Sequence, residues 1–285
     1  MTEPAPLFDR DALIRQRARA QRLGAALFLH QEAAFEIKEK LIDVNRSFTS
    51  PAVVTGFPLF WREGFPDASI VSDDETLGLE VGAHDLVIHA MALHWANDPV
   101  GQLIQCRRAL KPDGLLVVAM LGGQTLNEMR AALSEAEVAI SGGLSPRVSP
   151  MIEIRDAGAL LQRAGFALPV ADGSHRTVSY ASPIALLKDL RAMGEANALA
   201  SRRKNIPPKH LFVEFERIYT KAFPAEDDRV VATFEMIFLT GWAPDESQPQ
   251  PLRPGSAKTR LADFLNTAEL GEDAKPVKDE EGRKR

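Results

Sequence analysis

The sequence predicts an α/β protein with a doubly wound sheet, and the features that predict it lie between residues 84 and 123. Residues 85–90 and 115–120 are short apolar runs, typical of parallel strands that are buried on both faces. Asp98 and Pro99 suit the cap and the first position of a helix between these runs, and the turn 111–114 ends that helix. Two parallel strands joined by a crossover helix indicate a doubly wound sheet, whose ligands bind outside the carboxyl ends of the strands.

The N-terminal segment is expected to form a helical lid. Apolar residues at helical spacing predict one helix to about residue 22 and a second from 25 to 41, with a break near Gly24. Two such helices cover one edge of the sheet, and docking of a partner protein is the alternative use for them. The first core strand is expected at 51–56, where Gly56 ends the apolar run.

The first half of the sheet is expected to be shortened. Val54 and Leu86 are only about 32 positions apart, whereas a single strand-helix-strand unit already takes roughly 30 residues. Residues 70–75 are the one strand candidate in this interval. We therefore predict that one strand-helix unit is missing here.

Beyond Gly123 helices and strands follow one another, which predicts an α+β C-terminal portion. We expect helices at 124–140, 154–164, 184–193 and 209–223, and strands at 166–171, 176–180 and 233–242. The predicted domains are a helical lid (1–46), an α/β domain with inserted helices (47–260) and a polar tail (261–285) whose composition predicts disorder.

Composition excludes several classes of function. The net charge of −5 provides no basic field, so nucleic acid is not an expected partner. The single cysteine, Cys106, forms no internal disulfide, and the six histidines lack the spacing of a metal site, so we expect no bound metal. The sequence has neither a nucleophile elbow nor a phosphate-binding Walker loop, which argues against hydrolases and kinases. The early acidic residues do not suit a secretory signal, and we expect a cytoplasmic protein.

Two groups of residues are candidates for a site at the carboxyl ends of the strands. His94 and Trp95 follow the strand 85–90, where an imidazole can act as a base and an indole can stack on a flat group. The alternative is that both side chains only cap the sheet and contact the N-terminal helices. Asp73 and Asp74, in the acidic run 73–75, can bind a ribose or an adenine amine, or form a solvated turn.

Several sequence motifs carry a resemblance to a known family. They are Leu93-His94-Trp95 with Asn97-Asp98, Leu110-Lys111-Pro112-Asp113-Gly114, Gly122-Gly123, Ser145-Pro146-Arg147, Arg163-Ala164-Gly165-Phe166 and Met193-Gly194-Glu195-Ala196-Asn197-Ala198. With them, the chain from residue 7 to about 257 resembles the methyltransferase-fold assembly factors of respiratory complex I. That family includes a mitochondrial arginine hydroxylase and is similar to the class I methyltransferases of biotin synthesis.

The resemblance implies a class I methyltransferase-like sheet and S-adenosylmethionine as cofactor. It places catalytic residues at His94 and Trp95, and cofactor-binding residues at Thr55, Gly56, Asp73, Asp74 and His89. The sequence departs from the family where a glycine-rich loop normally follows the first strand, since Phe57 is bulky and Pro58 lacks an N–H.

Two functions therefore remain open. The first is a methyltransferase, or a hydroxylase on that scaffold, which modifies a protein side chain. The second is a non-catalytic binding or assembly protein with a degenerate cofactor loop. A complex I subunit is the partner that the resemblance implies, and the absence of a long apolar run leaves only peripheral contact with a membrane.

Overall fold

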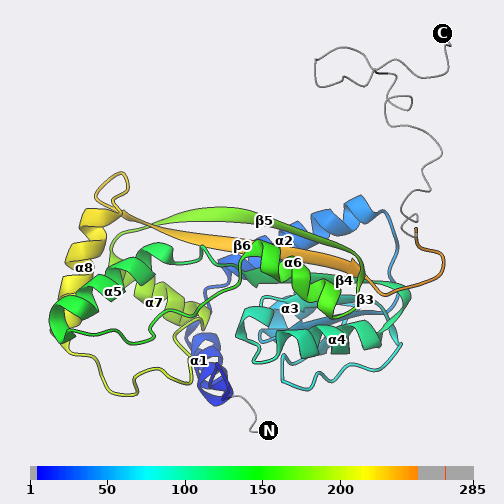
Figure 1. Cartoon of the computed structure of the whole chain (residues 1–285), viewed down its shortest axis with the longest axis horizontal. Helices are drawn as coiled ribbons and strands as arrows, with labels where there is room; N and C mark the ends of the chain where they lie inside the picture. The colour runs from blue at the N-terminus through cyan, green and yellow to red at the C-terminus, as the bar shows by residue number, and fades with distance from the viewer. Residues whose placement is uncertain (1–4, 250–266, 268–285) are drawn as a thin grey trace, which may run out of the picture. The chain divides into compact units, whose positions relative to one another are not determined.

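The computed structural model describes residues 5–249 and 267 of the chain, in which helices alternate with strands (Figure 1). The helices are α1 (Arg10–Leu23), α2 (Phe28–Val44), α3 (Pro58–Gly64), α4 (Pro99–Ala109), α5 (Asn127–Ser141), α6 (Ile154–Arg163), α7 (Pro183–Met193) and α8 (Lys209–Ala222), with the short 3-10 helix η1 (Leu93–Trp95). The strands are β1 (Pro51–Thr55), β2 (Ser69–Val71), β3 (His84–Ala90), β4 (Leu110–Leu121), β5 (Ala167–Tyr180) and β6 (Val230–Trp242).

These strands form one mixed sheet with the order β2-β1-β3-β4-β6-β5. The first four strands run parallel, whereas β6 is antiparallel to both β4 and β5. In this described sheet, only α3 and β2 lie between β1 and β3, so the predicted loss of one strand-helix unit is confirmed. The chain turns from one direction of the sheet to the other between β1 and β3, and such a switch point is where open α/β sheets bind ligands.

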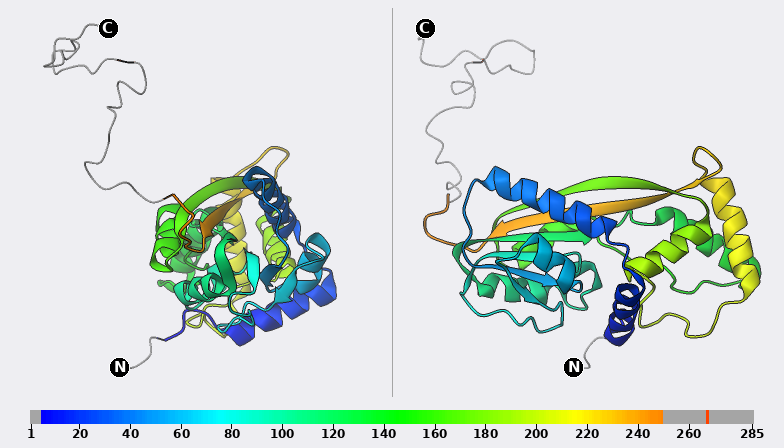
Figure 2. Two further views of the ribbon diagram at one scale, coloured as in Figure 1. Left: turned by 90° about the vertical axis from the view of Figure 1, so that its right-hand side faces the viewer. Right: turned by 180° about the vertical axis from the view of Figure 1, so that it is seen from behind.

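Both faces of the sheet are buried. Alternate side chains along β4 point into two different apolar cores. Leu116, Val118 and Met120 pack in one apolar core with residues of α4 and α6. Leu115 and Val117 face the other core, to which α2 and α3 contribute. The two views in Figure 2 show the helices on these opposite faces. This burial explains why the strands read as continuous apolar runs instead of alternating ones.

The break predicted near Gly24 is confirmed. Gly24 ends α1 with a φ of 87°, a backbone conformation that favours glycine, and α2 begins four residues later at Phe28. The crossover helix also begins as predicted, because the Asp98 side chain accepts a hydrogen bond from the Gly101 N–H and Pro99 takes the first helical position.

One local prediction was wrong. Residues 167–171 and 176–180 belong to one long strand, β5, which pairs with β6 along nearly its whole length and has an irregular register near Ala167. Pairing with the neighbouring strand overrides the local turn preference there. The segment 111–114 does end the crossover helix, since α4 stops at Ala109. This segment lies within the bounds of β4, with Asp113 at a φ of 56° where the register against β3 shifts.

Residues up to Glu246 form one compact unit, which includes the two N-terminal helices together with the sheet. The predicted polar tail lies outside the described residues, apart from Thr267. None of the helices in the described part of the chain has the length and apolar character needed to cross a membrane.

Candidate functional site

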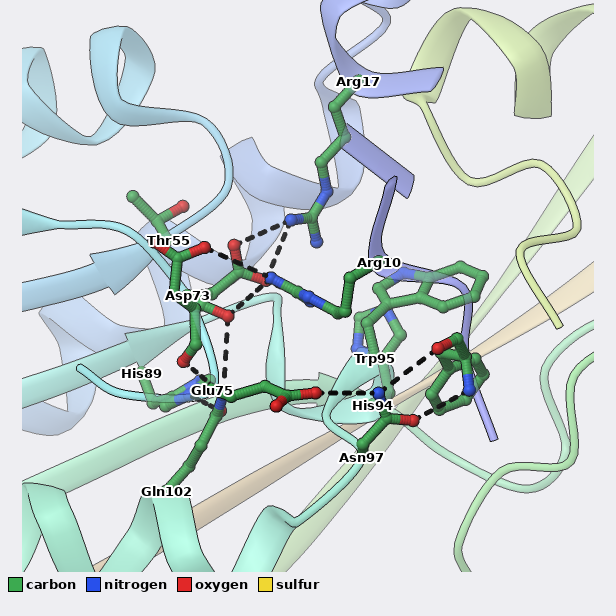
Figure 3. A network of polar contacts seen from close by, with 12 residues as sticks. Arg10, Arg17, Thr55, Asp73, Glu75, His89, His94, Trp95, Asn97 and Gln102 are labelled. Carbon is green, nitrogen blue, oxygen red and sulfur yellow. Dashed lines mark hydrogen bonds and ion pairs between the residues drawn. The ribbon is translucent and has the colours of Figure 1, made fainter. Parts of the chain in front are cut away.

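The candidate residues gather at the carboxyl ends of β1, β2 and β3, where α1 also lies (Figure 3). A hydrogen-bonded pair fastens the segment before α1 at this place, because the Phe8 N–H donates to Asn97 Oδ1 at 2.8 Å and Asn97 Nδ2 donates to the Phe8 carbonyl at 3.2 Å. The Phe8 ring meets the Trp95 ring edge to face at 5.0 Å. The lid is thus attached to the loop that follows β3.

His94 and Trp95 both point to a third residue, Glu195. Trp95 Nε1 donates to Glu195 Oε2 at 2.7 Å, and His94 Nε2 lies 3.4 Å from the same oxygen. The Leu121 N–H donates to His94 Nδ1, so the imidazole proton is on Nε2 and faces the carboxylate. Both rings are buried. Their polar atoms therefore orient Glu195, and Trp95 also contacts the lid as the alternative interpretation expected.

Glu195 is a largely buried carboxylate, with its side chain 10% exposed, and it stays ionised. Burial by itself raises the pKa of this carboxyl, but the hydrogen bonds from His94 and Trp95 and the charge of Arg17 outweigh burial and hold the pKa below its usual value. The backbone places Glu195 directly after α7, because Gly194 ends that helix with a φ of 79°. The site thus presents a fixed negative charge at neutral pH.

An apolar cavity of about 230 Å³ opens beside Glu195. Its walls include Leu121, Leu126, Met129 and Leu190, and Trp95 lies in the same wall. Trp95 lies beyond the end of β3 and Leu121 is the last residue of β4, so the ends of these two strands meet at the cavity. Glu195, Arg147 and Arg191 are the charged residues among those that line it. A cavity with mostly apolar walls and an oriented carboxylate suits a ligand that has a long apolar stem and a cationic end.

Asp73 carries a second buried charge, at the end of β2. Arg17 Nη1 donates to both of its carboxylate oxygens at 2.9 and 2.8 Å, and Arg10 Nη1 lies 3.3 Å from Oδ2. Burial raises the pKa of Asp73, but the two guanidinium groups lower it by more. Asp74 is more exposed and lies 3.9 Å from Arg10. The acidic turn is therefore a docking point for α1.

Arg17 lies directly over Gly56. A Cβ on Gly56 would come within 2.2 Å of Arg17 Nη1, so this glycine gives the guanidinium its space. The guanidinium carbon is also 5.9 Å from the centroid of the Phe57 ring. The loop that departs from the glycine-rich pattern is thus packed against an arginine of the lid.

A cavity of about 300 Å³ remains next to this arginine, between α1 and the ends of β1 and β2. Its lining includes Thr55, Gly56 and Asp73, three of the residues expected at the cofactor. Within the described part of the chain, Arg17 Nε and Nη2 have no hydrogen-bond partner although both are buried. Unpaired buried donors are costly, so a ligand with acceptor atoms gains free energy by entering here.

His89 lies deeper, within β3. Its Nε2 donates to Gln102 Oε1 at 2.9 Å, and Gln102 Nε2 donates to the Asp74 carbonyl at 2.9 Å. Burial lowers the pKa of His89 to about 4, so the ring is neutral. His89 fixes the loop that carries Asp73, and it is not among the residues that line the neighbouring cavity.

The pair Gly122-Gly123 and Cys106 have packing roles. A Cβ on Gly122 would come within 2.6 Å of Glu235 Oε2, and one on Gly123 within 2.4 Å of Glu153 Oε1. Burial raises the pKa of the Cys106 thiol to about 12, so it is protonated and unreactive.

Glu195 and Arg17 were not among the residues predicted for the site. Arg17 had a signal, because it shares the buried stripe of α1 with Leu13 and Ala20, where an arginine is unexpected. Glu195 lies in one of the motifs of the resemblance, but its partners are about 100 residues away in the sequence. No local pattern shows such a pairing.

Parts of the chain are similar in sequence to known proteins. Residues 18–118 match a family described as a methyltransferase domain. The chain is 36% identical over 208 residues to "Arginine-hydroxylase NDUFAF5, mitochondrial" of Danio rerio, covering 73% of this chain and 64% of the relative. It is 38% identical over 199 residues to the human protein of that name, covering 70% and 57%. Over these spans the chain is similar to the NDUFAF5 proteins.

The match to NDUFAF5 proteins spans less than two thirds of their length, between 46% and 64% in the relatives from five species. A malonyl-[acyl-carrier protein] O-methyltransferase of Laribacter hongkongensis is also related, at 34% identity over 177 residues, covering 62% of this chain and 57% of that enzyme. The chain is thus similar both to the NDUFAF5 proteins and to this O-methyltransferase, and part of it matches a methyltransferase domain.

Among solved structures, YcgJ of Bacillus subtilis matches with a TM-score of 0.44 and 9% identity, covering 70% of this chain and 94% of YcgJ. A SAM-dependent methyltransferase of Thermotoga maritima has a TM-score of 0.43 and 11% identity, and the match covers 82% and 100% of the two chains.

Proposed function

We propose that this chain is a methyltransferase-fold enzyme that binds and modifies an arginine side chain of a partner protein. The observation that carries the proposal is the buried, ionised carboxylate of Glu195 in the wall of an apolar cavity. The name of the NDUFAF5 relatives, arginine hydroxylase, supports the same substrate class. The resemblance to complex I assembly factors favours a subunit of that complex as the partner.

The chemistry of the cavity suits an arginine. Leu121, Leu126 and Met129 provide apolar walls for the three methylene groups of the side chain. A guanidinium has donors in a planar fork that matches a carboxylate, and Glu195 has the required charge. Two arginines also line the cavity. Arg147 Nη2 pairs with Glu137 at 2.7 Å, and Arg191 is exposed in the last turn of α7.

The residues near β1 fit S-adenosylmethionine on two observations. The cavity beside Thr55 and Gly56 lies at the switch point of the sheet, and the unpaired donors of Arg17 suit an anionic group. When bound, this cofactor supplies an electrophilic methyl group. The chain's own part is to hold the ligand with Thr55, Asp73 and Arg17, and to hold the guanidinium of the substrate with Glu195.

A second candidate is a non-catalytic assembly protein that only binds the arginine. The packing of Arg17 over Gly56 favours it, because this packing closes the place where a glycine-rich loop normally approaches the cofactor. Titration with S-adenosylmethionine separates the two candidates, since the assembly protein needs no cofactor.

The test of arginine recognition is calorimetric titration with a peptide that contains one central arginine. We expect binding, and we expect matched peptides with citrulline or lysine at that position to bind at least tenfold more weakly, since they lack the charge or the fork. In Glu195→Gln, which keeps the size and the hydrogen bond from Trp95, affinity for the arginine peptide falls to that of the citrulline peptide.

Glu39→Gln is the control, because Glu39 lies exposed on α2 and takes no part in the cavity. Equal affinity of wild type and Glu195→Gln for the arginine peptide would contradict the proposal. Mass spectrometry of the peptide after incubation with S-adenosylmethionine then distinguishes modification from binding alone.

A further inference from the structure

Arg17 uses two of the five hydrogen-bond donors of its buried guanidinium. Its Nη1 binds both oxygens of Asp73, while Nε and Nη2 have no partner among the described residues, although Arg17 is only 4% exposed. A guanidinium has five donors in a fixed fork, and a carboxylate is the acceptor that matches two of them. Nε and Nη2 can therefore donate to a ligand.

The surroundings limit which group provides that acceptor. The cavity of about 300 Å³ beside Arg17 is lined by Ile14 and Ala18 of the lid, by Thr55 and Gly56, and by Asp73. The polar groups that oppose each other there are a cation, Arg17, and an anion, Asp73 (Figure 3). A ligand that offers both a carboxylate and an ammonium complements both.

We infer that Arg17 binds the carboxylate of a ligand with an α-amino acid end, and that Asp73 binds its ammonium group. Among the described residues, Arg17 is the one hydrogen-bond donor to Asp73 Oδ1, whereas Oδ2 also accepts from Arg10. Oδ1 is therefore the oxygen that a ligand ammonium binds when Arg17 turns to the ligand carboxylate. This inference rests on the proposed function for the presence of a cofactor. It adds that the lid, and not the loop after β1, recognises the amino acid end.

The loop after β1 has few donors for that purpose. The Phe57 N–H donates to Thr55 Oγ1 at 3.1 Å, and Pro58 has no N–H. The helix that follows, α3, has only seven residues. An arginine from α1 thus provides the charge-assisted donors that a glycine-rich loop otherwise supplies through its backbone.

The test is calorimetric titration of the full chain with S-adenosylhomocysteine and with 5′-methylthioadenosine, a thioether nucleoside that lacks the amino acid end. We expect wild type to bind S-adenosylhomocysteine at least tenfold more tightly. In Arg17→Gln the affinity for S-adenosylhomocysteine falls by about 10- to 100-fold, while that for methylthioadenosine is unchanged. Arg19→Gln, an exposed arginine on the same helix, is the matched control and changes neither affinity.

Arg17→Lys keeps the positive charge beside Asp73 but lacks the planar set of donors of a guanidinium. It therefore serves as a second test if Arg17→Gln unfolds. We expect Arg17→Lys to lose at least half of the tenfold preference for S-adenosylhomocysteine over methylthioadenosine. Three results overturn the inference: no binding of S-adenosylhomocysteine to wild type at millimolar concentration, equal binding of the two nucleosides, or an unchanged preference in both Arg17 variants. The peptide titration with Glu195→Gln is read separately, so arginine recognition stands or fails independently of this result.

Discussion

Two arginines of the lid share one carboxylate, that of Asp73, beneath α1. Arg17 and Asp73 are both almost fully buried, and Arg10 adds a hydrogen bond to the Asp73 carbonyl at 2.7 Å. Taking such charges out of water is costly, and the pair is stable only while both partners are present. At the scale of single residues, removing the charge of Asp73 is therefore expected to lower the free energy of unfolding strongly.

Asp73→Asn is expected to lower the free energy of unfolding at pH 7 by about 3 kcal/mol, because it leaves a buried guanidinium without its counter-charge. The matched control is Asp74→Asn, whose side chain is 60% exposed and lies 3.9 Å from Arg10. That variant is expected to change stability by no more than about 0.5 kcal/mol. Urea denaturation followed by circular dichroism measures both. Equal effects of the two substitutions would mean that the buried pair has no special role.

At the scale of elements, contacts of the segment before α1 hold the lid in place. Phe8 is 3% exposed and packs with Leu13 and Trp95, and with Ala198 and Leu199 of the loop after α7. The backbone follows the same contacts, since the Asp9 N–H donates to the Ala198 carbonyl at 2.8 Å. The lid is thus tied at once to the loop after β3 and to the loop that carries Glu195.

Phe8→Ala tests this attachment. We expect a loss of about 3 to 5 kcal/mol in the free energy of unfolding, the usual cost of truncating a buried aromatic side chain. Leu7→Ala removes a side chain that is 46% exposed, and a change below about 1 kcal/mol is expected for it. Denaturant titration gives both values, and a Phe8→Ala protein as stable as wild type would show that the lid is not fastened by this contact.

At the scale of the whole molecule, two buried neutral histidines make stability depend on pH. Burial lowers the pKa of His30 from 6.5 to about 3 and that of His89 to about 4. Trp61 Nε1 donates to His30 Nδ1 at 3.0 Å, so this ring accepts a hydrogen bond in its neutral form. Below pH 6.5 the unfolded chain binds protons at both positions that the folded chain does not, so stability falls as the pH decreases.

Between pH 6 and pH 5 each of these histidines is expected to lower the free energy of unfolding by about 1.4 kcal/mol per pH unit at most. In His30→Asn, whose amide oxygen can still accept from Trp61, the slope of stability against pH decreases by the contribution of one proton. Urea titrations at several pH values give these slopes. The slope is compared within each protein, so a lower overall stability of the variant does not affect the result. An unchanged slope would mean that His30 is protonated in the folded chain.

The sequence by itself determined the elements whose signals are local. The capped crossover helix after Asp98, the break at Gly24 and the apolar runs of β3 and β4 follow from residue types at short spacing, and they were confirmed. The loss of one strand-helix unit followed from chain length alone, because about 32 positions between Val54 and Leu86 leave no space for two units. The placement of His94 and Trp95 beyond a strand end followed from the same pattern.

Only the tertiary structure decided what these residues face. Trp95 meets a carboxylate 100 positions away, and Asp73 meets an arginine 56 positions away. Pairing with β6 merged two predicted strands into β5, since a continuous ladder satisfies the backbone better than the local turn. Contacts between distant segments depend on how the sheet brings strand ends together. Residue spacing and composition do not predict which of these residues meet. For this reason the sequence predicted a candidate site at these strand ends, while only the structure shows that Glu195 and Arg17 place their charges there.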